Sequence, residues 1–417
     1  MSILPDLPSS TLASSPARLR CDVFCHVVDN FGDAAVCWRL ARSLAAHHGF
    51  AVRLWIDRPE VLAALQPAVD PALDRQVLDA VDIRRLPPSR PSTDLPDVAI
   101  DAFGNGLPAA YADALAARRP RALWIVLEYL SAEDWAAGVH GLASPHPSLD
   151  IRRFFFCPGF GVEGGGLLRE PGLVEAREAF DADARARAQF WDGLGLAQPP
   201  EASTVVSLFG YPNPGLPGLL ASMAAGPRPV LLALSPGALG DAAVGWLATA
   251  AGRADALAAG SLQARRLPFL PQPGYDDLLR ASDLNFVRGE DSLVRALWAA
   301  RPLCWQLYPQ QDDAQCPKLE AFIGAAGRLC DDGMPAGGSD GPHPAAHAHA
   351  AWARLQRAWN GCGLAPAARS RAVADAWQPA FDALPVLGQR AGRLARQLAS
   401  APDLAARLAG FCRDQLK

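Results

Sequence analysis

Two aspartates stand four positions apart near the start of the chain, where a run of apolar residues ends. Asp29 and Asp33 are separated by Asn30, Phe31 and Gly32 in the sequence DNFGD. A carboxylate can take a proton from a nucleophile, and a glycine permits backbone shapes closed to other residues. The spacing therefore predicts an acid–base site. Asp33 could instead cap a helix, and Asp29 and Asn30 could be ordinary turn residues.

A second polar turn lies in the other half of the chain, at Arg288-Gly289-Glu290-Asp291-Ser292. A helix is expected to begin there, and the first N–H groups of a helix are unpaired and carry partial positive charge. Together with Arg288, that helix start suits a diphosphate. Asp291 or Ser292 could cap the helix, but a cap does not account for Arg288 or Glu290.

Aromatic and amide side chains follow two further strands of the same half. Gln272 has the donor and acceptor needed to read the edge of a pyrimidine. Phe269 could stack on such a ring or could pack in the core. Tyr275 lies three positions after Gln272, and Tyr211 follows a strand that ends at Gly210. These residues predict a nucleotide-base site beside the diphosphate turn.

Both polar turns connect a buried strand to an amphipathic helix. Such alternation predicts parallel sheets covered by helices, in which ligands bind at the carboxyl ends of the strands. Neither turn has the spacing of a dinucleotide fingerprint or of a P-loop. The predicted strands are 21–28, 51–57, 97–103, 122–130 and 152–157 in the first half, then 204–210, 229–234, 262–270, 284–288 and 303–308 in the second.

A proline-containing stretch at 197–203 separates the two halves and reads as a linker. Two consecutive α/β halves predict two facing Rossmann-like domains with a cleft between them, as in the GT-B glycosyltransferases. The predicted units are a disordered tail at 1–18, an acceptor-binding N-terminal domain at 19–197, a nucleotide-sugar-binding C-terminal domain at 198–385 with a surface insertion at 334–350, and a C-terminal helix at 386–417 that could cross back to the N-terminal domain.

The composition argues against several other classes of protein. A net charge of −4 gives no overall attraction to nucleic acid, and no apolar run reaches the roughly 18 residues of a membrane span. Nine cysteines without a C-x-x-C pair predict reduced thiols and a cytoplasmic location. His343, His347 and His349 lack an acidic or cysteine partner at ligand spacing, so no metal is expected there. Five glycines within 158–166 predict a mobile loop.

Taken together, these motifs resemble EarP, the family of protein-arginine rhamnosyltransferases of elongation factor P. The segments that carry the resemblance are DNFGD with AAVCWRLARSLA, LPFLPQPGYDDLL, and SDLNFVRGEDSLVRALWAARPLCWQLYPQQD. The resemblance runs from Cys21 to the helix after Tyr308. It implies a GT-B fold, dTDP-β-L-rhamnose as donor, an arginine of elongation factor P as acceptor, and inversion at the anomeric carbon, a modification that activates this translation factor.

The resemblance also implies roles for single positions. Asp29, Asp33 and Glu290 match the catalytic set, which we interpret as Asp33 acting as general base, Asp29 holding the sugar and the guanidinium, and Glu290 orienting the acceptor. The matching donor-binding residues are Asn30, Phe31 and Gly32 in the first turn, Arg288, Gly289, Asp291 and Ser292 in the second, Phe269, Gln272 and Tyr275 at the thymine end, and Tyr211 near the phosphates.

The sequence departs from the family pattern at Pro212, where an acidic residue is usual. No D-x-D motif stands at a strand end, so we expect transfer without a metal or other cofactor, with Arg288, Tyr211 and the helix start stabilising the leaving dTDP. Two alternatives remain open from the residues alone. One is a GT-B enzyme with a lipid or small-molecule acceptor, and the other is a non-catalytic sugar-nucleotide-binding protein.

Overall fold

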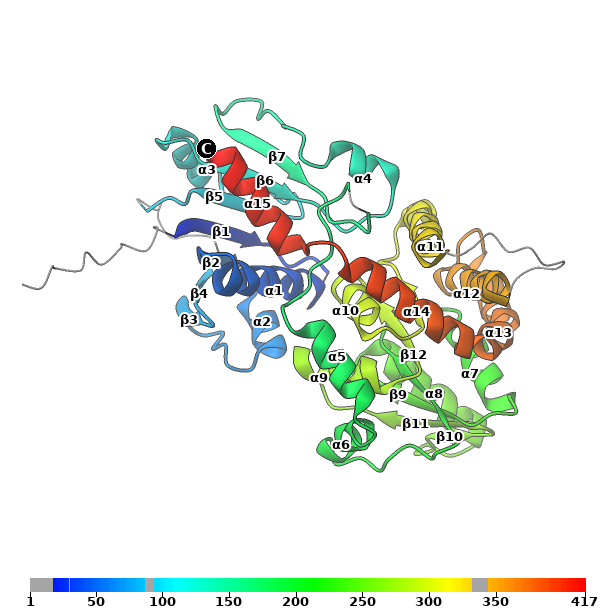
Figure 1. Cartoon of the computed structure of the whole chain (residues 1–417). Helices are drawn as coiled ribbons and strands as arrows, with labels where there is room; N and C mark the ends of the chain where they lie inside the picture. Colours follow the sequence, from blue (N-terminus) through cyan, green and yellow to red (C-terminus); the bar gives the residue numbers. More distant parts are fainter. Residues whose placement is uncertain (1–17, 30, 87–93, 162, 332–343) are drawn as a thin grey trace, which may run out of the picture.

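The computed structural model describes residues 18–29, 31–86, 94–161, 163–331 and 344–417. Two sheets, each built from one half of the chain, form the body of the described residues (Figure 1). Asn30 and nearly all of the predicted tail lie outside the described residues, as do 334–343 of the predicted insertion.

The first sheet has seven strands in the order β3-β4-β2-β1-β5-β6-β7. Its strands are parallel except at β3, which pairs antiparallel with β4. The chain leaves β1 for β2 on one side and later returns to β5 on the other, so the carboxyl end of β1 lies at a topological switch point. The strands are β1 (Leu19–Cys25), β2 (Phe50–Ile56), β3 (Arg75–Leu78), β4 (Val81–Arg85), β5 (Val98–Ala102), β6 (Leu123–Leu127) and β7 (Arg152–Phe156).

Helices α1 (Phe31–His47), α2 (Pro59–Leu65), α3 (Ala109–Ala117) and α4 (Asp134–Val139) accompany this sheet. The buried side of α1 carries several small apolar residues, among them Ala34, Cys37 and Ala41, and it packs on β1 and β2. Trp38 and Leu40 of α1 are fully buried in that core. The packing fixes the direction of α1, and with it the first polar turn.

The second sheet has the order β10-β11-β9-β8-β12-β13, again parallel except at its first strand. Its switch point lies between β8 and β12, so the second polar turn also stands where ligands bind in such sheets. The strands are β8 (Thr204–Leu208), β9 (Val230–Leu234), β10 (Ala258–Ala259), β11 (Leu262–Arg266), β12 (Leu284–Arg288) and β13 (Leu303–Gln306), and the helices are α7 (Leu216–Ala225), α8 (Ala238–Ala251), α9 (Gln272–Ala281) and α10 (Asp291–Ala299).

The remaining elements connect the two sheets or cover one of them. They are α5 (Leu173–Ala182), α6 (Ala186–Gly193), the short 3-10 helix η1 (Gln311–Asp313), α11 (Cys316–Asp331), α12 (Pro344–Asn360), α13 (Pro366–Asp382), α14 (Leu384–Ala399) and α15 (Leu404–Leu416). The prediction of a surface insertion at 334–350 is wrong for residues 344–350, because α12 begins at Pro344. Ala345 and Ala348 are buried, so their small size reflects helix packing rather than low complexity.

The C-terminal segment forms two helices where the sequence predicted one. The chain leaves α14, which packs on α10, α11 and α12, and re-enters a helix at Leu404. Asp403 caps α15 by accepting from the N–H groups of Ala405 and Ala406. Leu404, Leu408 and Cys412 of α15 then join the core of the first sheet, and Figure 1 shows this crossing in red.

The glycine-rich loop after β7 is packed rather than loose, against the expectation of a mobile loop. Gly165 N–H bonds Cys157 O at 2.7 Å, and Gly159 N–H bonds Gly166 O at 3.2 Å. From α15, Arg407 donates to Gly164 O at 2.7 Å. A Cβ on Gly165 would lie 2.7 Å from the Phe156 ring, which explains why glycine is needed at that position.

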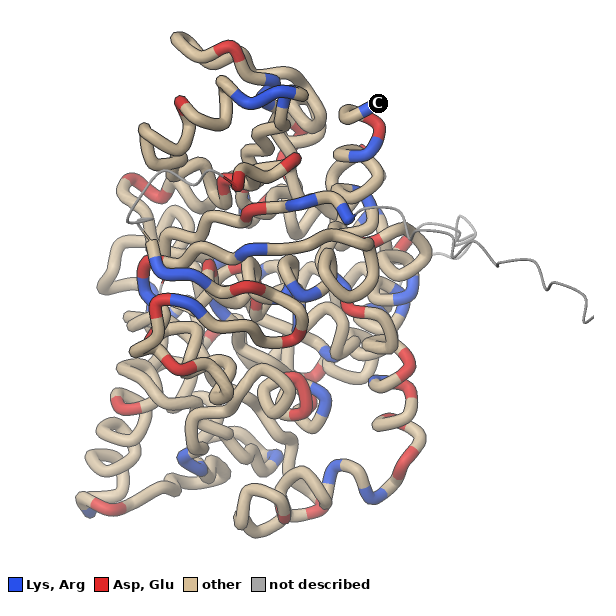
Figure 2. The backbone as a smooth tube through the Cα atoms, turned by 90° about the vertical axis from the view of Figure 1, so that its left-hand side faces the viewer, with Lys and Arg blue, Asp and Glu red and all other residues tan. Residues whose placement is uncertain are grey.

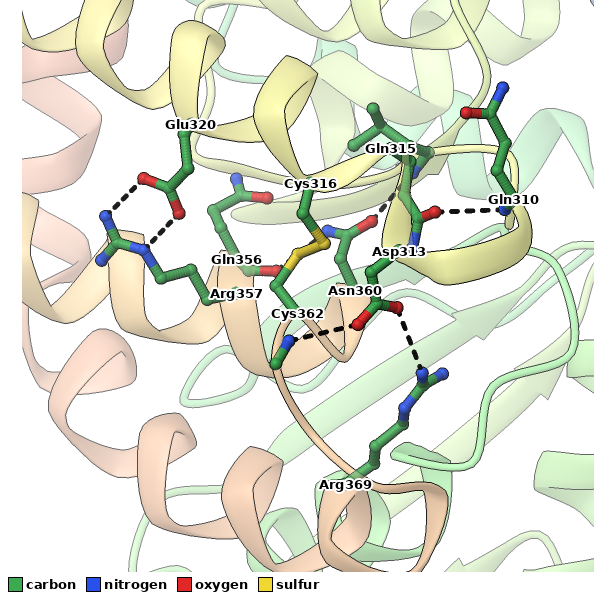
Figure 3. Close-up of a disulfide and its surroundings, with 12 residues drawn as sticks. Gln310, Asp313, Gln315, Cys316, Glu320, Gln356, Arg357, Asn360, Cys362 and Arg369 are labelled. Carbon is green, nitrogen blue, oxygen red and sulfur yellow. Dashed lines mark hydrogen bonds and ion pairs between the residues drawn. A yellow bond between two sulfur atoms is a disulfide. The ribbon is translucent and has the colours of Figure 1, made fainter.

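One pair of cysteines contradicts the prediction of reduced thiols. Cys316 and Cys362 form a disulfide with a Cα–Cα distance of 5.8 Å, which joins the start of α11 to the turn after α12 (Figure 3). The two residues are 46 positions apart, so their pairing depends on the fold and no local sequence pattern predicts it. The seven other cysteines are free and buried.

Positions of both charge signs occur throughout the part of the chain that the structure describes (Figure 2). Figure 2 shows acidic and basic residues interleaved along the described chain. In the part of the chain that the structure describes, no helix has both the length and the apolar character to span a membrane.

Candidate active site

Asp33 holds the first polar turn in shape. It lies in the first turn of α1, is 2% exposed, and its Oδ2 accepts from the N–H groups of Val28 and Asp29, both at 2.8 Å. No donor among the described residues is bound to Oδ1. Burial raises the pKa of Asp33, and the two backbone bonds oppose that rise. Asp33 therefore has a structural role and retains one oxygen for chemistry.

Asp29 joins the two halves of the molecule through Tyr211. Its Oδ2 accepts a hydrogen bond of 2.6 Å from the hydroxyl of Tyr211, in the loop after β8. The Tyr211 N–H in turn donates to Gln306 Oε1 at 2.9 Å. Burial, and then the hydrogen bond to Asp29, raise the pKa of Tyr211, so its hydroxyl stays protonated. Asp29 is thus placed by both sheets at once.

A glycine is needed at position 289, where the second polar turn approaches Asp29 and Tyr211. Its φ of +61° lies in the left-handed region. A Cβ there would stand 2.9 Å from Asp29 Oδ2 and 3.3 Å from the Tyr211 hydroxyl. The N–H of Gly289 donates to Gln306 O at 3.1 Å and its carbonyl accepts from Trp305 Nε1 at 2.7 Å. These two bonds to β13 hold the backbone of the second polar turn, and the other side of the turn faces Asp29.

Glu290 precedes α10 and has partners from both halves. Its Oε2 accepts from the Leu130 N–H, just after β6, at 2.8 Å, and its Oε1 pairs with Lys318 Nζ at 2.7 Å. Burial raises the pKa of Glu290, Lys318 lowers it, and the charge of Asp33 raises it again. The partners of Glu290 thus come from Leu130 in the first half and Lys318 in the second.

A cavity of about 410 Å³ lies between the two halves. It is open enough for a nucleotide sugar, and ten of the predicted site residues line it: Asp29, Phe31, Gly32, Phe269, Gln272, Tyr275, Arg288, Gly289, Asp291 and Ser292. Asp33, Tyr211 and Glu290 do not line it, and Glu290 instead borders a small void of about 30 Å³. Of the three predicted catalytic carboxylates, Asp29 therefore lines the cavity, and Asp33 and Glu290 do not.

Arg288 provides an available positive charge in this cavity. Its guanidinium lies between the rings of Phe209 and Tyr211, 4.6 Å from each centroid. Among the described residues it forms no ion pair. The Arg288 N–H donates to Ser292 Oγ at 3.2 Å, and that hydroxyl also bonds the Arg288 carbonyl. Arg288 is suited to an anionic ligand, whereas Ser292 shapes the turn.

The far end of the cavity holds unsatisfied polar groups. Gln272 Nε2 and the Tyr275 hydroxyl are buried and have no hydrogen-bond partner among the described residues. Leaving such donors unpaired costs about 1–3 kcal/mol each, so they favour a ligand that offers acceptors. Phe269 is 43% exposed, and its centroid lies 5.1 Å from that of Phe31 across the cavity. A flat heterocycle with carbonyl groups fits this end.

Sequence reasoning missed a buried ion network that crosses the same boundary. Arg39 of α1 pairs with Glu170 at 2.8 Å and with Asp291 at 3.2 Å. Arg295 of α10 pairs with Glu170 and, through two bonds of 2.8 and 2.6 Å, with Asp276. The one available signal was Arg39 itself, a charge on the apolar face of a helix. Asp291 is thus a partner of Arg39, which limits its part in diphosphate binding.

A second cavity, of about 520 Å³, opens on the first sheet beside the candidate site. Asp101 and Glu128 line it together with Trp124 and His146. Burial raises the pKa of Asp101 to about 6. No residue of this cavity was singled out from the sequence as catalytic, although Glu128 directly follows β6. Among the described residues, no group of three or more His, Cys, Asp or Glu side chains is arranged to hold a metal ion.

Two α/β sheets with a nucleotide-sized cavity between their switch points, edged by carboxylates and an available arginine, define a GT-B glycosyltransferase. Comparison with known proteins identifies the family. The model of the family described as elongation-factor P (EF-P) rhamnosyltransferase EarP matches residues 21–413. The chain belongs to this family.

Relatives and a solved structure agree with that assignment. The chain is 40% identical over 396 residues to the protein-arginine rhamnosyltransferase of Pseudomonas aeruginosa, covering 95% of this chain and 99% of the relative. It is 41% identical to that of Pseudomonas putida, with the same coverage. A solved structure concerned with EarP-mediated arginine glycosylation of translation elongation factor EF-P matches with a TM-score of 0.62 and 30% identity, covering 95% of this chain and 99% of the other. The predicted GT-B fold and family are confirmed.

Proposed function

We propose that this enzyme transfers L-rhamnose from dTDP-β-L-rhamnose to an arginine side chain of elongation factor P, with inversion at the anomeric carbon. The observation that carries the proposal is a cavity lined by Asp29 from one half and by an available cation, Arg288, from the other, with the hydrogen bond between Asp29 and Tyr211 joining the two halves. Family membership supports the sugar and the acceptor.

The donor would lie across the large cavity. Its thymine carbonyls would accept from Gln272 and Tyr275, whose donors are otherwise unpaired. Its diphosphate would meet Arg288 and the N-terminal N–H groups of α10, where positive charge is concentrated. We propose that these groups stabilise the dTDP leaving group without a metal.

The acceptor poses the harder chemical problem. A guanidinium has a pKa above about 12, and its lone pair is delocalised, so it is a poor nucleophile. In the proposed mechanism, Asp33 Oδ1 accepts the proton of the attacking nitrogen, and the raised pKa of Asp33 suits that task. The nitrogen then displaces dTDP in line from the opposite face of the sugar, which inverts the anomeric carbon.

The other two carboxylates would hold the reactants. Asp29, positioned by Tyr211, would contact the sugar and the guanidinium. Glu290, held by the Leu130 N–H and Lys318, would orient the acceptor from the second half. Because each of these carboxylates has a hydrogen-bond partner in the other half of the chain, the relative placement of the two halves controls the geometry of the reaction.

The direct test is the intact mass of elongation factor P after incubation with the enzyme and dTDP-rhamnose. The proposal expects a gain of one deoxyhexose, and fragmentation should place it on arginine. UDP-glucose in place of the donor, and a lipid extract in place of the acceptor, serve as controls. Transfer to lipid with none to elongation factor P would show a different acceptor class, and binding of dTDP-rhamnose without any transfer would indicate a non-catalytic protein.

A further inference from the structure

Tyr129 is an aromatic residue of the site that the mechanism above does not use. It follows β6, and its ring stacks on that of Phe103, which follows β5, with 4.4 Å between centroids and 15° between the ring planes. Phe103 has a φ of +65°, a conformation uncommon outside glycine, which turns the chain sharply after β5. The stacked pair therefore occupies the carboxyl ends of two adjacent strands, next to β1.

The Tyr129 ring lies beside the ion pair of Glu290 and Lys318. Its neighbour Leu130 donates to Glu290. Burial, followed by the negative charges of Asp33, Glu290 and Asp29, raises the pKa of Tyr129, which keeps its phenol protonated. A neutral aromatic face close to a carboxylate is a favourable place for a cation.

The site already places one cation beside this ring. Lys318 Nζ pairs with Glu290 at 2.7 Å and lies 5.8 Å from the Tyr129 centroid. Gly104 and Glu128, the sequence neighbours of the stacked pair, line the cavity of about 520 Å³.

We propose that the face of Tyr129 is the platform on which the acceptor guanidinium lies, an inference that rests on the proposed function. A guanidinium is planar, delocalised and weakly hydrated, so it stacks on an aromatic ring while its edge donates to carboxylates. Stacking fixes the plane of the group and aims one nitrogen at Asp33. The ammonium of a lysine has no plane to align, so Tyr129 contributes to selecting arginine over lysine.

Two variants separate the ring face from the hydroxyl. Tyr129→Phe keeps the face, and Tyr129→Leu removes it at similar bulk. We expect the KM for elongation factor P to stay within about threefold in the first and to rise about 10- to 30-fold in the second, as loss of a desolvated cation–π contact implies. The dissociation constant of dTDP should be unchanged in both variants, which monitors the donor site. The melting temperature should be unchanged in Tyr129→Phe and slightly lower in Tyr129→Leu, which loses the stacking on Phe103.

Binding of N-methylguanidinium, followed by NMR titration, tests the same platform without the acceptor protein. The proposal expects wild type and Tyr129→Phe to bind it with similar affinity and Tyr129→Leu to bind it at least about tenfold more weakly. An unchanged KM and unchanged methylguanidinium affinity in Tyr129→Leu would overturn the inference alone, provided that wild type modifies elongation factor P.

A wild-type enzyme that leaves elongation factor P unmodified would overturn the proposed function instead. In that case methylguanidinium binding that depends on Tyr129 would still support a guanidinium platform, and its absence would end that idea as well. If Tyr129→Leu weakens dTDP binding as much as acceptor binding, the residue is structural and the inference fails.

Discussion

The hydroxyl of Tyr211 donates a 2.6 Å hydrogen bond to Asp29, and this bond connects the first polar turn of one sheet to the second sheet. Asp29 follows β1 and Tyr211 follows β8, and each of these strands stands at the switch point of its own sheet. The bond therefore brings the two switch points together, and the nucleotide-sized cavity lies beside it. The proposed chemistry depends on this contact between the two sheets more than on either polar turn alone.

Asp33→Asn should separate chemistry from binding. Asparagine retains an oxygen for the Val28 and Asp29 N–H groups but cannot take a proton from the acceptor. We expect kcat to fall about 10²- to 10⁴-fold while the dissociation constant of dTDP, measured by calorimetry, changes little. Asp57→Asn is a matched control, because Asp57 also accepts a backbone N–H, from Val27 at 3.0 Å. Near-normal turnover in Asp33→Asn would remove Asp33 as the base.

Arg288→Gln tests the diphosphate site. Hydrogen bonds to charged groups are worth about 1.5–3 kcal/mol, so we expect dTDP to bind about 10- to 100-fold more weakly. Stability should change little, because Arg288 forms no ion pair among the described residues. Arg288→Lys keeps the positive charge but lacks the planar guanidinium. Its affinity for dTDP should therefore lie between those of wild type and Arg288→Gln. If dTDP binds Arg288→Gln as tightly as wild type, the diphosphate lies elsewhere.

The activity of Lys318→Met should have a changed pH dependence. Lys318 lowers the pKa of Glu290 against the larger effect of burial, which raises it. Removing the ammonium therefore raises that pKa further, and less Glu290 is ionised at acidic pH. The acid limb of the kcat/KM profile should move to higher pH in Lys318→Met and stay in place in Lys318→Arg. Coinciding acid limbs in all three proteins would show that Glu290 ionisation does not govern the reaction.

Much of this site could be predicted from the sequence because its parts are local. A strand, a glycine-containing turn and a helix follow one another within a few residues in both DNFGD and NFVRGEDS, and the resemblance to a known family supplied their roles. Ten predicted residues accordingly line one cavity. The hydrogen bonds from two backbone N–H groups to Asp33 were harder to predict from the sequence, since a carboxylate in a turn can face either the backbone or a ligand.

The parts that escaped prediction are those made by tertiary contact. Arg39 and Glu170 are 131 positions apart, and Cys316 and Cys362 are 46 apart. Nothing in the local pattern of either pair specifies its partner. The start of α12 at Pro344 was missed because alanine and histidine read as low complexity, although proline is favoured in the first turn of a helix.

Glu170→Gln should weaken the connection between the two halves in a pH-dependent way. Burial alone would raise the pKa of Glu170, but Arg295 and Arg39 outweigh it and lower that pKa to about 2. A lowered pKa stabilises the folded state above the unfolded value, near 4.5, and this contribution is lost as pH falls toward about 2.

At pH 7 we therefore expect Glu170→Gln to be less stable by about 3 kcal/mol, measured by urea unfolding. The difference from wild type should shrink as pH falls below about 4. The exposed Glu175→Gln of α5 is the control and should behave as wild type. A difference that persists undiminished toward pH 2 would contradict the ionic origin of the effect.

The central claim is that residues of both halves meet over a single sugar nucleotide. A crystal structure of the enzyme with dTDP-β-L-rhamnose measures this directly. The account predicts the diphosphate on Arg288 and the start of α10, the thymine on Gln272, and the anomeric carbon between the carboxylates of Asp33 and Glu290. A nucleotide bound outside the cavity, or a sugar directed away from both carboxylates, would contradict it.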